Sequence, residues 1–192
     1  RRAFYFQAAY NGCLKKPPDY LMLIRPATAA DIPAITAIYN HAVRHTLAIW
    51  NEAEVSTAER QAWWQARQAA GYPVLVAADE TAAILGYAGF GDWRAFAGFR
   101  HTAEHSVYVH PEHQGRGVGK ALLQALVVEA RACGKHVLVG GIESGNQGSI
   151  ALHQSLGFVC SGSMPQVGCK FGRWLDLQWW QLQLDQAAAP PP

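Results

Sequence analysis

Apolar and polar residues follow two different periods along this chain, and the periods predict helices and strands in turn. A helix over about residues 31–45 is predicted by apolar residues at helical spacing: Ile32, Ile35, Ile38, Tyr39 and Ala42. A second helical pattern runs from Thr57 to Ala69. Short apolar runs predict a strand beginning at Met22 and strands at residues 73–78 and 83–90, with Gly71-Tyr72-Pro73 as a break.

The second half of the chain continues the alternation. Strands are predicted at Glu104–His110 and His136–Ile142, and helices from the glycine-rich loop to Cys133 and over Gln147–Leu156. Two more strands are expected near Phe158 and over Trp174–Leu184. Because no long linker or repeat interrupts the series, the pattern indicates one α/β domain.

The two ends of the chain differ from this pattern. Residues 1–21 are irregular and aromatic and close with Lys15-Lys16-Pro17-Pro18, whereas the last residues read AAAPPP. We therefore interpret residues 1–21 as a leader or extension outside the domain, 22–185 as the domain and 186–192 as a tail.

Composition narrows the class of protein. The chain has 192 residues, of which 50% are hydrophobic and 16% charged, enough for one globular core. A net charge of +2 is too small to indicate a nucleic-acid or membrane-surface partner, and neither a membrane-spanning run nor a signal peptide is evident. The four cysteines form no C-x-x-C pair, so we interpret them as reduced thiols of a cytoplasmic protein and as small, buried hydrophobic residues.

The stretch VYVHPEHQGRGVGKALLQAL, residues 107–126, leads from a strand through a glycine-rich loop into a helix. A nucleotide-triphosphate loop is excluded, because Gln114 and Ala121 occupy positions that require Gly and Ser or Thr. The dinucleotide fingerprint fails too, since Lys120 or Leu122 stands where its third glycine belongs. The remaining motif, Gln-Gly-Arg-Gly-Val-Gly, suits a pyrophosphate held by backbone N–H groups at a helix start, or is an ordinary strand-to-helix turn.

The order Gln-x-x-Gly-x-Gly between strand and helix resembles the acetyl-coenzyme A loop of the GNAT superfamily of N-acetyltransferases. Three blocks extend the resemblance over residues 22–185: FGDWRAFAGFRHTAEHSVYVHPEHQGRGVG, GIESGNQGSIALHQSLGF and MPQVGCKFGRWLDL. They are similar to the branch that acetylates free amino acids and analogues, namely methionine sulfone, methionine sulfoximine and phosphinothricin. The resemblance implies an α/β GNAT fold, a mixed, mostly antiparallel sheet with splayed strands flanked by helices.

The resemblance also implies residues that bind acetyl-coenzyme A. They are the backbone of Val107, Tyr108 and Val109, the loop residues Gln114, Gly115, Arg116, Gly117, Val118, Gly119 and Lys120, and Asn146. Backbone N–H groups of the strand are free only if its neighbour splays away. Asn146 can alternatively cap the helix that follows, and the two roles are compatible.

Two side chains are candidates for acid–base chemistry. Glu104 matches the family's catalytic glutamate and could take the ammonium proton of the acceptor; the alternative is a solvated carboxylate at a strand end. The tyrosine that protonates the leaving thiolate in many GNAT enzymes is absent, and His153 stands at its place. His153 could serve as the acid, or water could do so while His153 lies on the helix surface.

A free amino acid acceptor offers a carboxylate and a side chain to bind. Arg94 is the bidentate candidate for the carboxylate, with Arg100 as the second choice. The expected substrate-binding set is Trp50, Trp93, Arg94, Ala95, Phe96, Glu104, His105 and Ser106. Phe90 is a further aromatic candidate for this pocket, and each of these aromatic residues could instead belong to the core.

Two further patterns concern metal binding and self-association. His41 and His45 have the helical spacing of a zinc pair, but no third ligand is apparent, so no metal is expected. The aromatic run KFGRWLDLQWW lies where the family commonly dimerises, which implies a homodimer; a core strand is the alternative.

Two rival functions remain open. One is acetylation of another amine, such as a polyamine, an antibiotic or a protein N-terminus, which would not require a carboxylate. The other is a non-catalytic acyl-coenzyme A binding module, against which Glu104 argues.

Overall fold

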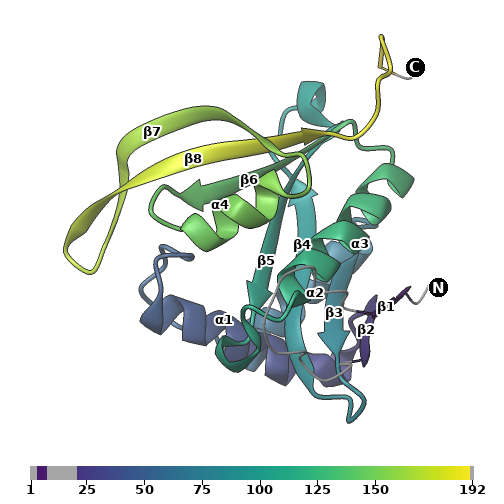
Figure 1. Ribbon diagram of the computed structural model, residues 1–192, viewed down its shortest axis with the longest axis vertical. Coiled ribbons are helices and arrows are strands. Elements are labelled where there is room, and N and C mark those ends of the chain that lie inside the picture. The colour runs from purple at the N-terminus through teal and green to yellow at the C-terminus, as the bar shows by residue number, and fades with distance from the viewer. Residues whose placement is uncertain (1–3, 8–20, 191–192) are drawn as a thin grey trace, which may run out of the picture.

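The computed structural model describes residues 4–7 and 21–190. Its strands make one mixed sheet, with helices on both faces (Figure 1). The strands are β1 (Phe4–Gln7), β2 (Leu21–Pro26), β3 (Val74–Ala78), β4 (Ile84–Asp92), β5 (Thr102–Val109), β6 (Val137–Glu143), β7 (Val159–Lys170) and β8 (Arg173–Gln183). The helices are α1 (Ile32–His45), α2 (Thr57–Ala69), α3 (Val118–Ala132) and α4 (Gln147–Gln154), with short 3-10 turns at Ala29–Asp31, Ala97–Phe99 and Pro111–His113.

The sheet has the order β1-β2-β3-β4-β5-β6-β8-β7, and every neighbouring pair is antiparallel except β5 and β6. The parallel pairing is short, running from Thr102 opposite Val137 to Glu104 opposite Val139. Past Glu104 the two strands separate, so the backbone of β5 from residue 105 onward is not paired with β6. The predicted mixed sheet with splayed strands is confirmed.

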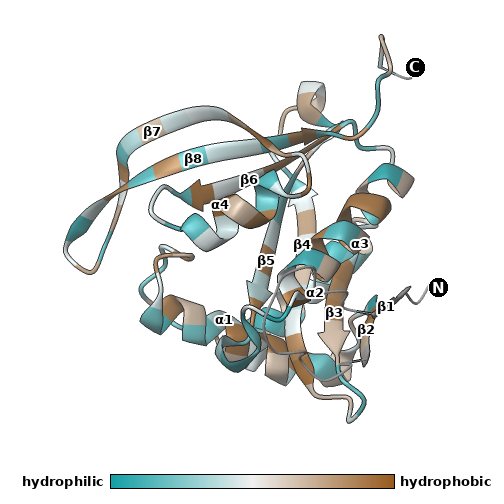
Figure 2. Cartoon of the chain, in the orientation of Figure 1, coloured by the Kyte–Doolittle hydropathy of each residue, from teal (hydrophilic) through white to brown (hydrophobic). Residues whose placement is uncertain are grey.

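Two apolar layers lie against the sheet, one on each face. On one face, Ile32, Ile35 and Ile38 of α1 and Trp64 of α2 pack with Val74, Val76 and Tyr87. On the other, α3 and α4 bury a larger cluster with the same strands, including Leu75, Ala88, Leu122, Leu126 and Phe158. Figure 2 shows hydrophobic colour along α1, α3 and the central strands, with hydrophilic residues on the outward sides of the helices.

Local signals fix where the helices begin. Ser56 and Glu59 form a capping box, in which the Glu59 N–H donates to Ser56 Oγ at 3.2 Å and the Ser56 N–H donates to Glu59 Oε2 at 2.7 Å. Consequently α2 has the predicted bounds. None of the helices within residues 21–190 is long and apolar enough to cross a membrane.

The largest difference from the sequence prediction is the final hairpin. A strand was expected only near Phe158, whereas β7 continues for 12 residues, from Val159 to Lys170, and pairs with β8. Small residues and Pro165 hide this strand in the sequence, and the pairing register shifts between Met164 and Gly168. The hairpin projects beside α4 in Figure 1.

The N-terminal prediction falls mostly outside the described residues. Residues 1–3 and 8–20 are not described, while Phe4–Gln7 forms β1 and pairs with β2 at the edge of the sheet. At the other end, residues 184–190 form no helix or strand, and 191–192 lie outside the described residues. The proposed leader and tail boundaries therefore stay predictions.

Candidate active site

Two cavities meet at β5. The larger has a volume of about 680 Å³ and extends from α1 and the glycine-rich loop to α4. The smaller, about 230 Å³, lies between the sheet and helices α1 and α2. Three side chains of β5, Glu104, Ser106 and Tyr108, line both cavities. A group bound in one cavity can therefore reach a group bound in the other at this strand.

The larger cavity gathers nearly all residues predicted to bind the coenzyme. They are Val107, Tyr108, Val109, Gln114, Gly115, Gly117, Val118, Gly119, Lys120 and Asn146, whereas Arg116 does not line it. Sequence reasoning missed the contributions of α1, through Ile38, His41 and Ala42, and of residues 140–143 in β6. These walls come from segments distant in sequence, and no local motif marks them.

The loop itself has the backbone that an anion site needs. Gly115 and Gly117 have φ angles of +73° and +82°, which side-chain-bearing residues rarely adopt. Gly117 is the N-cap of α3, so the first N–H groups of the helix and its positive dipole end face the cavity mouth.

Asn146 caps α4 and lines the same cavity. Its Oδ1 accepts a hydrogen bond from the Ser149 N–H at 3.0 Å. The capping alternative is therefore confirmed, and a coenzyme contact remains compatible with it.

Glu104 lies half-buried on β5, opposite Gly91 of β4 and Val139 of β6, at the last paired residue before the strands separate. Burial raises the pKa of Glu104 above its ordinary value, and the positive charges of Arg94 and Arg67 oppose the rise. A carboxylate with a raised pKa is a better base toward an ammonium group than a solvated one.

Two histidines form a buried pair on the opposite face of the sheet from Glu104. The Nε2 atoms of His105 and His153 lie 2.9 Å apart. Each Nδ1 contacts a backbone carbonyl at 2.7 Å: that of Val139 for His105 and that of Ser149 for His153. Phe158 packs against both rings.

The geometry of this pair fixes where its protons lie. Carbonyl oxygens only accept hydrogen bonds, so both Nδ1 atoms carry hydrogen, and in neutral rings both Nε2 atoms are then acceptors. Burial lowers the pKa of His105 to about 3, with a contribution from His153, and burial also lowers the pKa of His153. The neutral pair therefore has two lone pairs facing each other, and one added proton would bridge them.

Residues 35–158 match the acetyltransferase (GNAT) family. This chain belongs to the GNAT family of acetyltransferases. The resemblance carried by the glycine-rich loop is thus confirmed.

Individual relatives sharpen the comparison. The L-methionine sulfoximine/L-methionine sulfone acetyltransferase of Salmonella typhimurium is 64% identical over 169 residues, covering 88% of this chain and 98% of that protein. The phosphinothricin N-acetyltransferase of Alcaligenes faecalis is 39% identical, over 80% of this chain and 78% of that one. A solved putative acetyltransferase from Salmonella typhimurium, with its cofactor acetyl-CoA, superposes with a TM-score of 0.86 at 64% identity, covering 88% and 98% of the two chains.

The predicted acceptor residues of this GNAT enzyme are spread over several environments. Arg94, Ala95, Phe96 and Arg100 are exposed in the segment between β4 and β5 and line neither cavity. Arg94 is nevertheless close enough to lower the pKa of Glu104, whereas Arg100 is not among the groups that do so. The position of Arg94 near Glu104 favours Arg94 over Arg100 as the candidate ligand of a carboxylate.

The remaining predicted acceptor residues divide between core and cavity. Glu104 and Ser106 line both cavities, whereas His105 lines only the larger one, together with its partner His153. Trp93 packs edge-on against Phe99 and Trp179 and lines neither cavity. Phe90 lines the smaller cavity, but its ring belongs to the core under α3.

Trp50 also lines neither cavity, and contacts with the final hairpin explain its position. Its ring lies over Gly168 of β7, where an added Cβ would come within 2.2 Å of it. The buried Lys170 Nζ donates to the carbonyls of Val43, Thr46 and Ile49 at 2.6, 2.9 and 2.5 Å. Lys170 thus joins the final hairpin to the end of α1 and to the loop that carries Trp50.

The smaller cavity holds the residues that sequence reasoning missed most clearly. Its walls include Tyr39 from α1, Arg60, Trp63 and Arg67 from α2, and Tyr87 from β4. The only available signal was that positions 60, 63 and 67 share one helix face. That signal does not separate a solvated face from a ligand-binding one.

No cluster of His, Cys, Asp or Glu side chains suited to a metal occurs in the described part of the chain. The rings of His41 and His45 lie 4.7 Å apart, and His41 lines the larger cavity. Cys133, Cys160 and Cys169 are free but exposed, which corrects the expectation of buried cysteines, and Cys13 lies outside the described residues.

Proposed function

We propose that this GNAT enzyme transfers acetyl from acetyl-coenzyme A to the α-amine of a small free amino acid or analogue, such as methionine sulfone, methionine sulfoximine or phosphinothricin. The observation that carries the proposal is the meeting of two cavities at Glu104, Ser106 and Tyr108. One cavity has the size and backbone loop for a coenzyme, and the other has the size for an amino acid. The acceptors named for the Salmonella and Alcaligenes relatives support this choice.

The reaction needs a neutral amine next to a thioester. Glu104 takes the ammonium proton, directly or through one water, and the amine then attacks the thioester carbonyl. The C–N bond forms, the C–S bond breaks, and the sulfur leaves as a thiolate that requires a proton. The unpaired edge of β5 beyond Glu104 offers N–H groups to the thioester oxygen and the pantetheine amides.

His153, together with His105, is the proposed route by which a proton reaches the thiolate. A low pKa makes an imidazolium a strong acid, so a proton that enters the pair passes on readily. Water is the alternative donor, since the larger cavity is open to solvent along its loop.

Arg94 is proposed to bind the acceptor's carboxylate. Among the groups whose charges act on Glu104 are Arg94 and Arg67, and the α-carboxylate is adjacent to the amine that Glu104 deprotonates. Arg67 is therefore a second cation at the same end of the smaller cavity.

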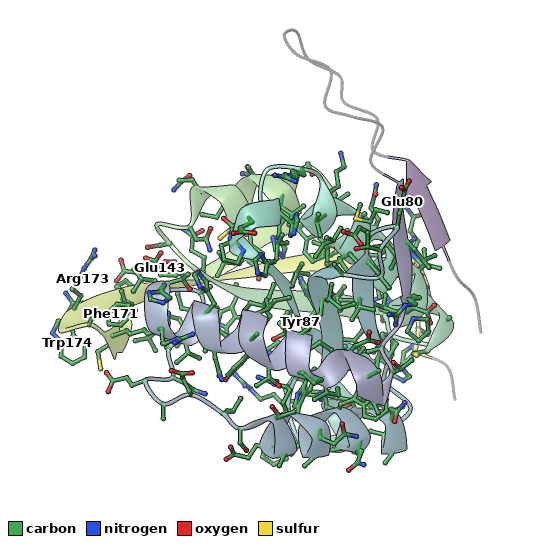
Figure 3. The ribbon with its side chains drawn as sticks, turned by 90° about the horizontal axis from the view of Figure 1, so that it is seen from below. Glu80, Tyr87, Glu143, Phe171, Arg173 and Trp174 are labelled. Atoms are coloured by element: carbon green, nitrogen blue, oxygen red, sulfur yellow. The ribbon has the colours of Figure 1, made fainter. Side chains whose placement is uncertain are left out.

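We also propose that the enzyme is a cytoplasmic homodimer. Five large apolar side chains are exposed on the β7–β8 hairpin: Val159, Met164, Val167, Phe171 and Trp174. Figure 3 shows Phe171, Arg173 and Trp174 together at its outer tip. A patch of this kind suits a partner subunit, and a monomeric mass in sedimentation would exclude the dimer.

A panel of amines tests the acceptor class. Purified protein with acetyl-coenzyme A is offered free amino acids, methionine sulfone, a polyamine, an aminoglycoside and a peptide, and release of the coenzyme thiol is followed. We expect the fastest release with methionine sulfone or a related analogue. Faster reaction with polyamine or peptide would support the rival amines, and no release with any acceptor would support a binding module.

A further inference from the structure

Two residues that line the smaller cavity each carry a buried polar atom with no partner among the described residues. The atoms are Nε of Arg60 and the hydroxyl of Tyr87, in residues that are 7% and 1% exposed. The Arg60 guanidinium stacks on the rings of Tyr39 and Trp63, at 3.7 and 4.6 Å, and has no carboxylate partner within residues 21–190. Buried donors without acceptors cost free energy unless a ligand or water supplies oxygen.

The cavity has two distinct ends, set by the pairing of β4 and β5. Glu104 lies opposite Gly91, and Tyr87 lies opposite Tyr108, four residues further along the sheet. At about 3.3 Å per residue, these two levels are about 13 Å apart along the backbone. Helix α2 spans the same distance. Arg67 covers Gly91, where any Cβ would collide with the Arg67 guanidinium. At the other end, the positive charge of Arg60 opposes the rise in the pKa of Tyr87 and Tyr108.

The two ends therefore suit different parts of one acceptor. The amine must lie at Glu104, and the α-carboxylate one bond beyond it meets the nearby cations, Arg94 and Arg67. Arg60 and Tyr87 are remote from Glu104 and can meet only the acceptor's side chain. Between the ends lie Trp63, Gly89 and Ser106, which leave room for an aliphatic chain beside an aromatic wall.

The chemistry at the far end favours a strong, compact hydrogen-bond acceptor. Burial raises the pKa of Tyr87 well above its ordinary value, so this hydroxyl stays protonated and donates. Among the described residues, Glu104 is the only carboxylate lining the cavity, so none of them repels an oxygen at Arg60. Figure 3 shows Tyr87 near the middle of the molecule, between the sheet and the helices.

We propose that Arg60 and Tyr87 bind an S–O or P–O oxygen at the end of the acceptor's side chain, and so make the enzyme selective for sulfonyl, sulfoximine or phosphinyl amino acids over their unoxidised counterparts. This inference rests on the proposed function. It adds two specificity-determining residues, Arg60 on α2 and Tyr87 on β4. Both lie outside the glycine-rich loop and the segment between β4 and β5.

The test compares two acceptors that differ only in oxygen, methionine sulfone and methionine. Tyr87→Phe removes the donor and keeps the ring, and Arg60→Gln removes the charge. We expect each variant to lower the ratio of kcat/KM for sulfone over methionine by roughly tenfold, while the methionine value stays close to wild type. Tyr72→Phe is the matched control, because its hydroxyl contacts Asp92 and Lys135 outside the cavity and should leave the ratio unchanged.

Phosphinothricin tests whether a charged P–O group depends on Arg60 more than a neutral S–O group does. Its charged phosphinyl group should lose more with Arg60→Gln than the neutral sulfone does. A ratio unchanged in both variants, or equal losses for sulfone and methionine in variants with wild-type circular dichroism, would overturn the inference. If the wild-type protein acetylates neither amino acid, it is the proposed function that fails.

Discussion

His105 and His153 face each other in the interior with their Nε2 atoms 2.9 Å apart, and each ring donates its Nδ1 hydrogen to a backbone carbonyl. The arrangement fixes both tautomers, and in the neutral pair no proton lies between the two Nε2 atoms. It also ties the middle of β5 to α4, so the same two residues bear on folding and on proton transfer.

The pair should make stability depend on pH. A histidine whose folded pKa is about 3 binds fewer protons when folded than when unfolded, so the free energy of unfolding falls as the pH drops from about 6.5 toward 3. Between pH 7 and pH 5, His105 alone should contribute a loss of about 2 kcal/mol. Urea unfolding of wild type and His105→Asn at both pH values measures it, with the exposed His45→Asn as control. If the pair instead holds a shared proton at pH 7, the wild type would lose much less stability between pH 7 and pH 5, because the folded state would then hold that proton at both pH values.

Glu104→Gln should lower kcat by roughly 10²-fold or more at neutral pH and leave coenzyme affinity nearly unchanged. Raising the pH should restore part of the rate, because solution then supplies the neutral amine. Since burial raises the pKa of Glu104, the wild-type rate should fall on the acid side as this carboxylate takes up a proton. Steady-state rates across pH test this prediction, with the exposed Glu80→Gln as the matched control (Figure 3). A wild-type profile for Glu104→Gln would show that another group is the base.

Gly117→Asp should weaken binding of acetyl-coenzyme A by at least about 2 kcal/mol, because a carboxylate would stand where the pyrophosphate is held. The substitution also strains a residue with a φ of +82°, so a control must carry the same strain elsewhere. Gly134→Asp does this, with a φ of +69° and an exposed position at the end of α3. Calorimetry that gives both variants the same coenzyme affinity would remove the loop assignment.

Lys170→Met should destabilise the protein by about 2–3 kcal/mol, because the three carbonyls of Val43, Thr46 and Ile49 lose a charged donor while the side chain stays buried. Urea denaturation measures the change. Arg173→Met, on the exposed tip of the same hairpin, is the control and should change little. Equal midpoints for both variants would show that Lys170 is not the connection between hairpin and α1.

Where local chemistry decided the structure, the sequence predicted it well. The capping box at Ser56 fixed α2, and the glycines at 115 and 117 fixed the entry to α3. These signals depend on residues within a few positions of each other, so the sequence alone is sufficient. Most of the residues predicted to bind the coenzyme line one cavity for the same reason.

Where distant segments meet, prediction failed or stopped short. His105 lines the larger cavity with Glu104 and Ser106, but neighbouring residues in a strand face opposite sides of a sheet, and the sequence did not predict that its ring pairs with His153 of α4. Arg60 and Arg67 received no role from the sequence, because no local motif shows that β4 lies beneath this face of α2. The link from Lys170 to residues more than a hundred positions earlier had no sequence signal at all.

The central claim, a free amino acid as acceptor, is tested most directly by comparing L-methionine sulfone with its α-carboxamide. The two differ only in the group assigned to Arg94 and Arg67, and the loss of a charged partner in a partly dry site should cost about 2–4 kcal/mol in kcat/KM. Arg94→Ala should impose a similar loss on the free acid and little on the amide, with Arg67→Ala and Arg100→Ala measured in parallel. Equal kcat/KM for acid and amide in the wild-type enzyme would contradict the account and direct the search to polyamines or peptide N-termini.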